Sequence, residues 1–382
     1  MPNGNIENAL LHAILGDIIG FGNGDTEFNN GNVFNKEKYP NFDRVGSEYS
    51  NELVFNFINE GGYSKHPKPN MTISDDTILL LANCKALTKI LEGKPMIESF
   101  LTEYIDIISG SRSDNTYQNF IDRYKGGITT STNLRNLQNG LDYLRFPYSS
   151  VAGGSGGSMR SGIIGAVYYK ESELNILLET CIESTLMTHP NAIAFLGSIA
   201  VALFASYIMR DIDIEQWILN MLDVLEDSNI DTIVLSKRPD FETEYKRDKM
   251  IFINKWKNYY EDKFDENTLK YKKNTALKYP SIRTMIYHNY SNRVNDIYPG
   301  AGGDDSVIIA FDCLINSNGS MESIVTFSML HVGDSDTTGC ICGFLYGLMY
   351  EKGPISEIMI NNIKTREFKS IKKIMKDFIK LL

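Results

Sequence analysis

The stretch from Ala192 to Met209, AIAFLGSIAVALFASYIM, limits most strongly what this chain can fold into. Its apolar length lies at the threshold for a membrane span. Gly197, Ser198 and Ser206 dilute the run, however, and the sequence has no second candidate span. We therefore expect a fully buried helix, which needs a shell of other helices around it.

Helical spacing of apolar residues dominates the rest of the chain. It predicts helices in NIENALLHAILGDIIG, SDDTILLLANCKALTKILEG, ELNILLETCIESTLMTH, DIEQWILNMLDVLED, DDSVIIAFDCLINS, TTGCICGFLYGLMYE and FKSIKKIMKDFIKLL. Alternating patterns are rare, and the best strand candidate is the short DTIVLSK. There is no fixed-period repeat and no low-complexity linker. The prediction is an all-α protein built as a single domain over residues 1–382.

Two stretches are irregular. Gly22 to Lys68 is rich in Asn, Gly, Asp and Tyr, and we expect a long surface loop there. The second stretch, at about residues 237–295, is rich in charged and aromatic residues. We predict that it forms a helical insert or flank. We expect the loops of the domain to gather on one side, where binding residues are commonly found.

Composition excludes several classes of protein. The net charge of −10 and the pI of about 5.2 argue against a free-standing nucleic-acid binder. Five cysteines, an odd number, lie mostly in apolar surroundings and indicate a reducing compartment. Cys340 and Cys342 have no second Cys/His pair nearby, which disfavours a zinc site. The N-terminus lacks the basic region of a signal peptide. We expect a cytoplasmic protein with no nucleic-acid or membrane partner.

The sequence ISDDTILLL places Ser74, Asp75 and Asp76 at the start of a predicted helix. Taken alone, these residues are typical of an N-terminal cap, which satisfies free backbone N–H groups and suits the helix dipole. Two adjacent carboxylates exceed what a cap needs, because they repel each other unless a cation lies between them or one is protonated.

A second acidic helix start lies near the other end of the chain, in HVGDSDTTGCICGFLYG. Here Asp334 and Asp336 precede an apolar segment, with Ser335 and Thr337 supplying hydroxyls. A cap is again the simplest interpretation. If the two helix starts converge, however, their carboxylates need a divalent metal. Oxygen-only ligands favour hard ions such as Mg²⁺.

Two glycine-rich segments could approach a phosphate through backbone N–H groups. The first, AGGSGGSMRSGIIG, matches neither the P-loop nor a dinucleotide fingerprint, so a flexible loop is the alternative. The second, YPGAGGDDSVIIAFD, begins at Tyr298 and could stack on a base or contact a phosphate before another acidic helix cap.

Taken in order, the motifs GDIIGFGNG, SDDT, GGSGGSMR, MTH and HVGDSDTTGCICG resemble those of the ADP-ribosylglycohydrolase family. The resemblance covers the chain from about Ala9 to Gly347. NGDTEF, RFPYSS, MTH and KWKNYY are most similar to the ADP-ribosylarginine hydrolase branch. The resemblance implies a compact, single-domain orthogonal helical bundle with two Mg²⁺ ions, for which Mn²⁺ is a possible substitute.

The resemblance also implies roles for individual residues. Metal ligands would be Ser74, Asp75, Asp76, Asp334, Asp336 and Thr337. The general base would be Asp75 or Asp76, with Asp336 as the next candidate. Substrate-binding residues would be Glu27, Gly153, Gly154, Ser155, Gly156, Gly157, Ser158, His189, Tyr298, Gly300, Gly302 and Asp305.

The implied reaction is hydrolysis of the N-glycosidic bond between ADP-ribose and an arginine side chain of a protein, with ADP-ribose as product. Two departures fall in substrate-contacting loops: Asp304 stands where the branch usually has histidine, and Lys125 replaces a common proline. Hydrolysis of a serine or O-acyl linkage therefore stays open. So does a catalytically silent ADP-ribose-binding or structural relative, although such relatives often lose the acidic ligands that this chain retains.

Overall fold

The computed structural model describes residues 2–28, 42–110, 116–291 and 298–382. Within these ranges the chain forms 18 α-helices and no β-strand, which confirms the all-α prediction. Two compact units are present. Unit 1 comprises Met1–Thr77 and Asn274–Lys373, and unit 2 comprises Ile78–Lys273 and Ile374–Leu382. The number of domains and the insert at about 237–295 stay predictions.

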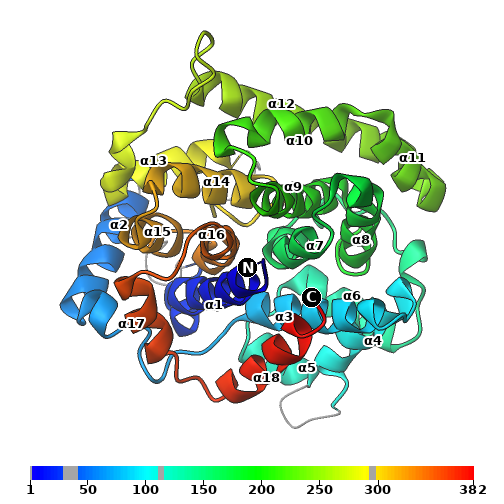
Figure 1. The fold of residues 1–382 in the computed structure, drawn as a ribbon, viewed down its shortest axis with the longest axis horizontal. Helices are drawn as coiled ribbons and strands as arrows, with labels where there is room; N and C mark the ends of the chain where they lie inside the picture. Colours follow the sequence, from blue (N-terminus) through cyan, green and yellow to red (C-terminus); the bar gives the residue numbers. More distant parts are fainter. Residues whose placement is uncertain (1, 29–41, 111–115, 292–297) are drawn as a thin grey trace. The chain divides into compact units, whose positions relative to one another are not determined.

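Most of the helices of unit 1 come from the two ends of the chain (Figure 1). They are α1 (Pro2–Phe21), α2 (Phe42–Asn59), α13 (Pro280–Tyr290), α14 (Asp305–Ser317), α15 (Met321–Ile324), α16 (Ser335–Met349) and α17 (Pro354–Asn362). Two further helices cross the boundaries of the units in sequence, α3 (Asp75–Leu91) and α18 (Phe368–Ile379).

Helices α1 and α16 pack side by side at the centre of unit 1 (Figure 1). Glycines spaced four residues apart line the contact. A methyl group added to Gly16 or Gly20 would overlap the backbone of Gly339 or Ser335, respectively. Only glycine permits the two helices to approach so closely, and this contact holds the start of α16 against the end of α1. The glycines around Cys340 and Cys342 therefore serve packing, and both cysteines are buried and free.

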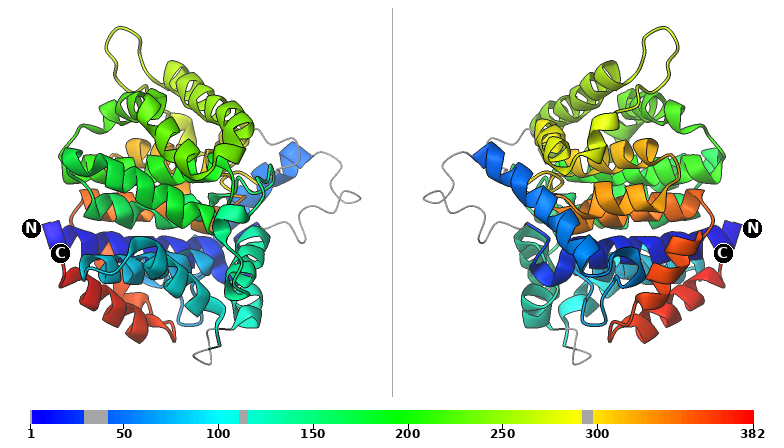
Figure 2. Two further views of the ribbon diagram at one scale, coloured as in Figure 1. Left: turned by 90° about the vertical axis from the view of Figure 1, so that its right-hand side faces the viewer. Right: turned by 90° about the vertical axis from the view of Figure 1, so that its left-hand side faces the viewer.

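Part of the predicted loop between Gly22 and Lys68 is helical, so that prediction was wrong in part. Ser50, Leu53 and Phe57 recur at helical spacing and bury one face of α2, which packs along α13 (Figure 2). Few apolar residues mark this face, which is why the polar composition suggested a loop. Residues 29–41 of the stretch lie outside the described residues.

Unit 2 surrounds the apolar helix α9 (Ala192–Met209). Its other helices are α4 (Met96–Ile108), α5 (Tyr117–Asp122), α6 (Ile128–Gln138), α7 (Gly162–Val167), α8 (Leu174–Leu186), α10 (Trp217–Glu226), α11 (Ser228–Lys237) and α12 (Glu242–Lys263). Of the described residues, α9 alone is long and apolar enough to cross a membrane, and 83% of it is buried in the fold. Helices α7, α8, α10 and α12 pack against it (Figure 1).

The strand predicted for DTIVLSK was wrong, because these residues belong to α11. Asp227 caps this helix by accepting a hydrogen bond from Asn229 N at 2.7 Å. Ile230 and Val234, four residues apart, are its buried side chains. The capping residue Asp227 therefore precedes the short alternating run. This cap and the spacing of four residues between the buried side chains favour a helix over a strand.

Candidate active site

The start of α3 is held by an acid from another helix. Asp17, on α1, accepts hydrogen bonds from Ser74 N at 3.1 Å to each carboxylate oxygen, and from Thr77 N at 3.2 Å. The hydroxyl of Thr77 donates to it as well. A fully buried carboxylate thus satisfies backbone N–H groups at the first turn of α3, where the helix dipole favours negative charge.

Ser74 performs the capping role that the sequence suggested. Its hydroxyl oxygen accepts a hydrogen bond from Asp76 N at 3.1 Å and lies 3.1 Å from Asp76 Oδ2, to which it donates. Since Asp17 and Ser74 together serve the backbone, the carboxylate of Asp76 is not needed as a cap. It is buried and directed to other partners.

Those partners lie at the start of α16. Asp334 caps this helix, accepting from Thr337 N at 3.4 Å, and Asp336 Oδ1 accepts from the same N–H at 3.0 Å. The hydroxyl of Thr337 donates to Asp76 Oδ1 at 3.1 Å. One side-chain hydrogen bond therefore joins two helix starts that are 261 residues apart in the sequence.

Two groups of carboxylates result, and Asp336 belongs to both. One oxygen from each of Asp17, Asp76 and Asp336 lies within 4.8 Å of the others. The same holds for Glu27, Asp334 and Asp336. Among the residues predicted as ligands, Asp76, Asp334 and Asp336 are thus brought together. Glu27, predicted beside a substrate ribose, is half-buried in the second group.

Burial makes this cluster costly when its members are ionised. Burial first, and then the neighbouring acids, raises the pKa values of Asp76, Asp334 and Asp336 well above the usual aspartate range. The pKa of Asp17 is raised to about 6 by burial, against the effect of its hydrogen bonds. Asp75 adds to the negative potential at Asp76 and Asp336.

The donor set fits a hard divalent cation. Asp336 Oδ2 is buried and has no hydrogen-bond partner within the described part of the chain. Neither acidic group includes a histidine or a cysteine. The nearby His331 is engaged through Nδ1 with Val332 O at 2.8 Å and through Nε2 with Thr338 Oγ1 at 2.7 Å. Oxygen ligands around an unpartnered carboxylate oxygen are what Mg²⁺ sites in proteins offer.

The glycine segment after Tyr298 is tied to the start of α16. Asp305 accepts from Gly300 N at 3.1 Å and from Gly302 N at 2.7 Å, so its carboxylate shapes this loop. Asp334 N donates to Pro299 O at 2.9 Å. The half-buried ring of Tyr298 meets the edge of Phe28 at a centroid distance of 5.1 Å.

Asp304, which stands where the arginine-hydrolase branch usually has histidine, begins α14. Its carboxylate oxygen accepts from Asp305 N at 2.9 Å. Lys125, the other departure, is exposed in unit 2 and has a positive φ of 54°.

A pocket of about 320 Å³ in unit 1 borders the turn after α1. Asn23, Asp25 and Thr26 line it on one side, and His66 and Lys68 line it elsewhere. The turn leads directly to Glu27, while the segment after Lys68 leads to Ser74. The pocket is therefore lined by segments that adjoin Glu27 and Ser74 in the sequence.

The remaining predicted residues lie in unit 2. Gly153 and Gly154 precede a buried 3₁₀-helix that spans Ser155–Arg160, so this segment is not a flexible loop. His189 lies directly over Gly156, because a Cβ atom there would come within 2.5 Å of the histidine Cε1. His189 Nδ1 lies 2.9 Å from Thr188 Oγ1. Only glycine at position 156 leaves room for this ring.

Asp17 was absent from the ligands that the sequence predicted. The signal that could have found it is an acidic residue inside the apolar run AILGDIIGF, next to Gly16. A fully buried aspartate needs hydrogen-bond donors or a cation, so its presence there points to a site.

Comparison with known proteins identifies relatives over the whole chain. The model of the ADP-ribosylglycohydrolase family matches residues 3–381. The ADP-ribosylhydrolase ARH1 of Dictyostelium discoideum is 30% identical over 390 residues, which cover 96% of this chain and 91% of that protein. The predicted ADP-ribosyl glycohydrolase L444 of Acanthamoeba polyphaga mimivirus is 32% identical over 348 residues. That match covers 89% of this chain but only 63% of the viral protein.

A solved structure described as an ADP-ribosylglycohydrolase-related protein complex shares the fold. The match covers 100% of this chain and 97% of the other, with a TM-score of 0.52 and 14% sequence identity.

Proposed function

The chain belongs to the ADP-ribosylglycohydrolase family, and we propose that it is a Mg²⁺-dependent hydrolase of ADP-ribosylated arginine in proteins. It would cleave the N-glycosidic bond between the ribose and the guanidinium group and release ADP-ribose. One observation carries the proposal: two groups of carboxylates, all buried except the half-buried Glu27, share Asp336, whose Oδ2 has no hydrogen-bond partner among the described residues.

Two divalent ions, one for each acidic group, account for this arrangement. Asp17, Asp76 and Asp336 would hold one ion, and Glu27, Asp334 and Asp336 the other. Ser74, Asp75 and Thr337 complete the oxygen-rich surroundings from the same helix starts. When bound, the ions would supply positive charge that orients the hydroxyl groups of the substrate ribose.

The protein side chains would then position the attacking water and accept its proton. Glycosidic bonds of this kind break with positive charge developing at the anomeric carbon, and a water oxygen forms the new bond to that carbon. A carboxylate accepts one proton of the water and can pass it on to the departing guanidine nitrogen, so the arginine side chain leaves protonated. Asp75 and Asp76 are the first candidates for the accepting carboxylate, and Asp336 is the next.

Recognition of the remainder of ADP-ribose would use backbone N–H groups. The glycine segment Gly153–Ser158 lacks bulky side chains, which suits a diphosphate approaching the backbone. His189 covers Gly156 and would limit how the substrate enters there. Tyr298 would stack on the adenine ring.

A panel of linkages tests the proposal directly. The protein is incubated with Mg²⁺ and with arginine-, serine- or O-acyl-linked ADP-ribose, and free ADP-ribose is measured by chromatography. We expect release from the arginine linkage, and its loss when EDTA replaces Mg²⁺. Release only from serine or acyl linkages would keep the hydrolase and reject arginine, and the unusual Asp304 would then be the first residue to exchange for histidine.

The cellular location is part of the same proposal. All five cysteines are buried and free, which suits a reducing compartment such as the cytoplasm. The proposed partners are an ADP-ribosylated protein and the ADP-ribose released from it.

A further inference from the structure

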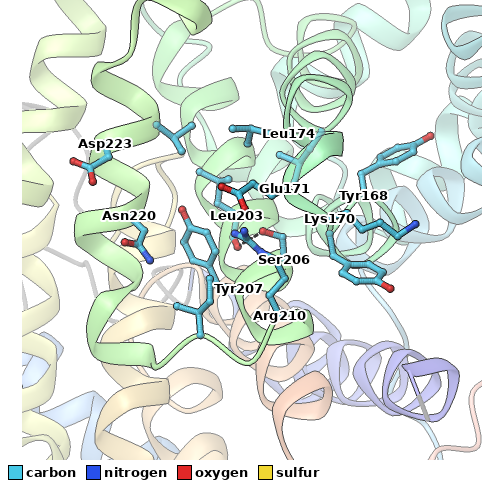
Figure 3. A pocket seen from close by; sticks show the side chains of 14 residues that line it. Tyr168, Lys170, Glu171, Leu174, Leu203, Ser206, Tyr207, Arg210, Asn220 and Asp223 are labelled. Atoms are coloured by element: carbon cyan, nitrogen blue, oxygen red, sulfur yellow. Dashed lines mark hydrogen bonds between the residues drawn. The ribbon is translucent and has the colours of Figure 1, made fainter.

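Unit 2 contains a second pocket, with a volume of about 320 Å³. Its walls come from the segment that joins α7 to α8, from the last turns of α9, and from α10 (Figure 3). None of its lining residues belongs to the acidic groups, the glycine segment or the loop after Tyr298. Its volume is at the small end of the range for ligand sites.

Tyr207, in the last turn of α9, and Arg210, which directly follows this helix, both line the pocket, and each has a polar atom without a hydrogen-bond partner among the described residues. Tyr207 is 2% exposed, and its hydroxyl has no hydrogen-bond partner among the described residues. The same is true of Arg210 Nε, and the guanidinium of Arg210 lies 5.3 Å from the centre of the Tyr207 ring. Burial raises the pKa of Tyr207, so its hydroxyl stays protonated and able to donate. Buried donors without partners are uncommon in proteins and indicate a missing acceptor.

Two acids line the same pocket. Glu171 and Asp223 are exposed at its edge, and neither has an ion-pair partner within the part of the chain that the structure describes. Figure 3 shows Glu171 extending toward the middle of the pocket, where Tyr207 and Arg210 also lie. Lys170, the other cation of the lining, is 3.5 Å from Glu173 and is already paired.

The charged residues of the pocket favour one class of ligand. A dianion such as phosphate would be attracted by Arg210 but repelled by Glu171 and Asp223. A carboxylate matches a guanidinium and a hydroxyl donor, and an ammonium group matches the two acids. Leucine and valine side chains, among them Leu174, Leu203 and Val224, form the rest of the lining.

We propose that this pocket binds a free α-amino acid with an apolar side chain. The carboxylate would accept hydrogen bonds from Arg210 and Tyr207, the ammonium group would face Glu171 and Asp223, and the side chain would pack on the leucines. This site is independent of the proposed hydrolase activity.

Isothermal titration calorimetry with three related probes tests the proposal. L-leucine carries both charges, 4-methylpentanoate lacks the ammonium group, and 3-methylbutylamine lacks the carboxylate. We expect leucine to bind at least tenfold more tightly than either analogue. Equal binding of 4-methylpentanoate would replace the proposal with a plain carboxylate site. No binding of leucine at millimolar concentration would overturn it.

Variants locate the binding site. Arg210→Gln should weaken leucine binding at least tenfold, and Tyr207→Phe several-fold, because each removes an unpartnered donor. Val224→Phe fills the pocket without changing its charge, and should abolish binding even if Arg210→Gln fails to fold. Matched controls are Arg145→Gln, with a side chain 86% exposed, and Tyr279→Phe, with a residue 62% exposed. Unchanged affinity in both Tyr207→Phe and Val224→Phe would place leucine elsewhere and reject this pocket.

Discussion

Helices α11 and α16 begin with the same two residues and use them differently. Asp227 and Ser228 start α11, and Asp334 and Ser335 start α16. Each aspartate caps its helix, and each helix carries another acid in its first turn. In α11 the second acid, Asp231, lies 2.5 Å from the ammonium of Lys249 and accepts from the Tyr245 hydroxyl at 2.6 Å.

In α16 the second acid has no such partner. Asp336 is buried beside Asp76 and Asp17, and none of these three has a lysine or arginine partner among the described residues. Exposure and a nearby ammonium make the start of α11 an ordinary cap. Burial and the convergence with α3 make the start of α16 a candidate metal centre. An acid-rich helix start therefore indicates a metal site only when other buried carboxylates, and no lysine or arginine, lie opposite it.

The largest expected effect separates these two helix starts by activity. Asp336→Asn and Asp76→Asn should each lower the rate of ADP-ribose release at least about 100-fold, since each removes a carboxylate on which the proposed chemistry depends. Asp227→Asn should leave the rate unchanged. The measurement is the initial rate with arginine-linked ADP-ribose and Mg²⁺, with folding checked by circular dichroism. Full activity in Asp336→Asn would remove that residue from the site.

The acids at the two ends of the chain could be predicted because each stands in a local pattern of Ser, Asp and Thr before an apolar helix. The sequence did not show whether the two helix starts converge, so the metal site could be predicted only on the condition that they do. Asp17 could not be predicted as a partner, because the hydrogen bonds that define its role come from residues 57 and 60 positions away. Helix α11 was missed because seven alternating residues, the length of about two helical turns, are too few to distinguish a strand from a helix.

The metal-free protein should lose stability as pH rises, and Asp17 should account for part of the loss. Its pKa is raised from 3.8 to about 6 in the folded protein. A raised carboxylate pKa favours the folded state below pH 3.8, and this advantage disappears as pH rises through 6. The shift corresponds to about 3 kcal/mol. Urea unfolding in EDTA from pH 4 to 7 should show this slope in the wild type, reduced in Asp17→Asn. A constant difference between the two proteins would contradict the expectation.

Mg²⁺ should restore the stability that ionised acids remove. A ligand that binds only the folded state at a concentration of 100 times its Kd adds about 2.7 kcal/mol to the free energy of unfolding. The gain should be larger at pH 7.5 than at pH 5, because the ligands bind metal as carboxylates. Differential scanning fluorimetry with and without Mg²⁺ measures it. Asp336→Asn should lose most of the increase in melting temperature, and Asp227→Asn should keep it. An equal increase in both variants would place the ion elsewhere.

The smallest expected effect concerns the caps themselves. Asp227→Ala should lower the free energy of unfolding by about 1 kcal/mol, because Asn229 N then lacks its acceptor, while Asp227→Asn should cost little. Asparagine also caps α16 in Asp334→Asn, so helix geometry is preserved at both starts. If α16 needed only its cap, Asp334→Asn would behave like Asp227→Asn in every assay. We expect instead that Asp334→Asn reduces the stabilisation by Mg²⁺ and the rate of hydrolysis, because the start of α16 needs the charge of its cap as well as the hydrogen bond.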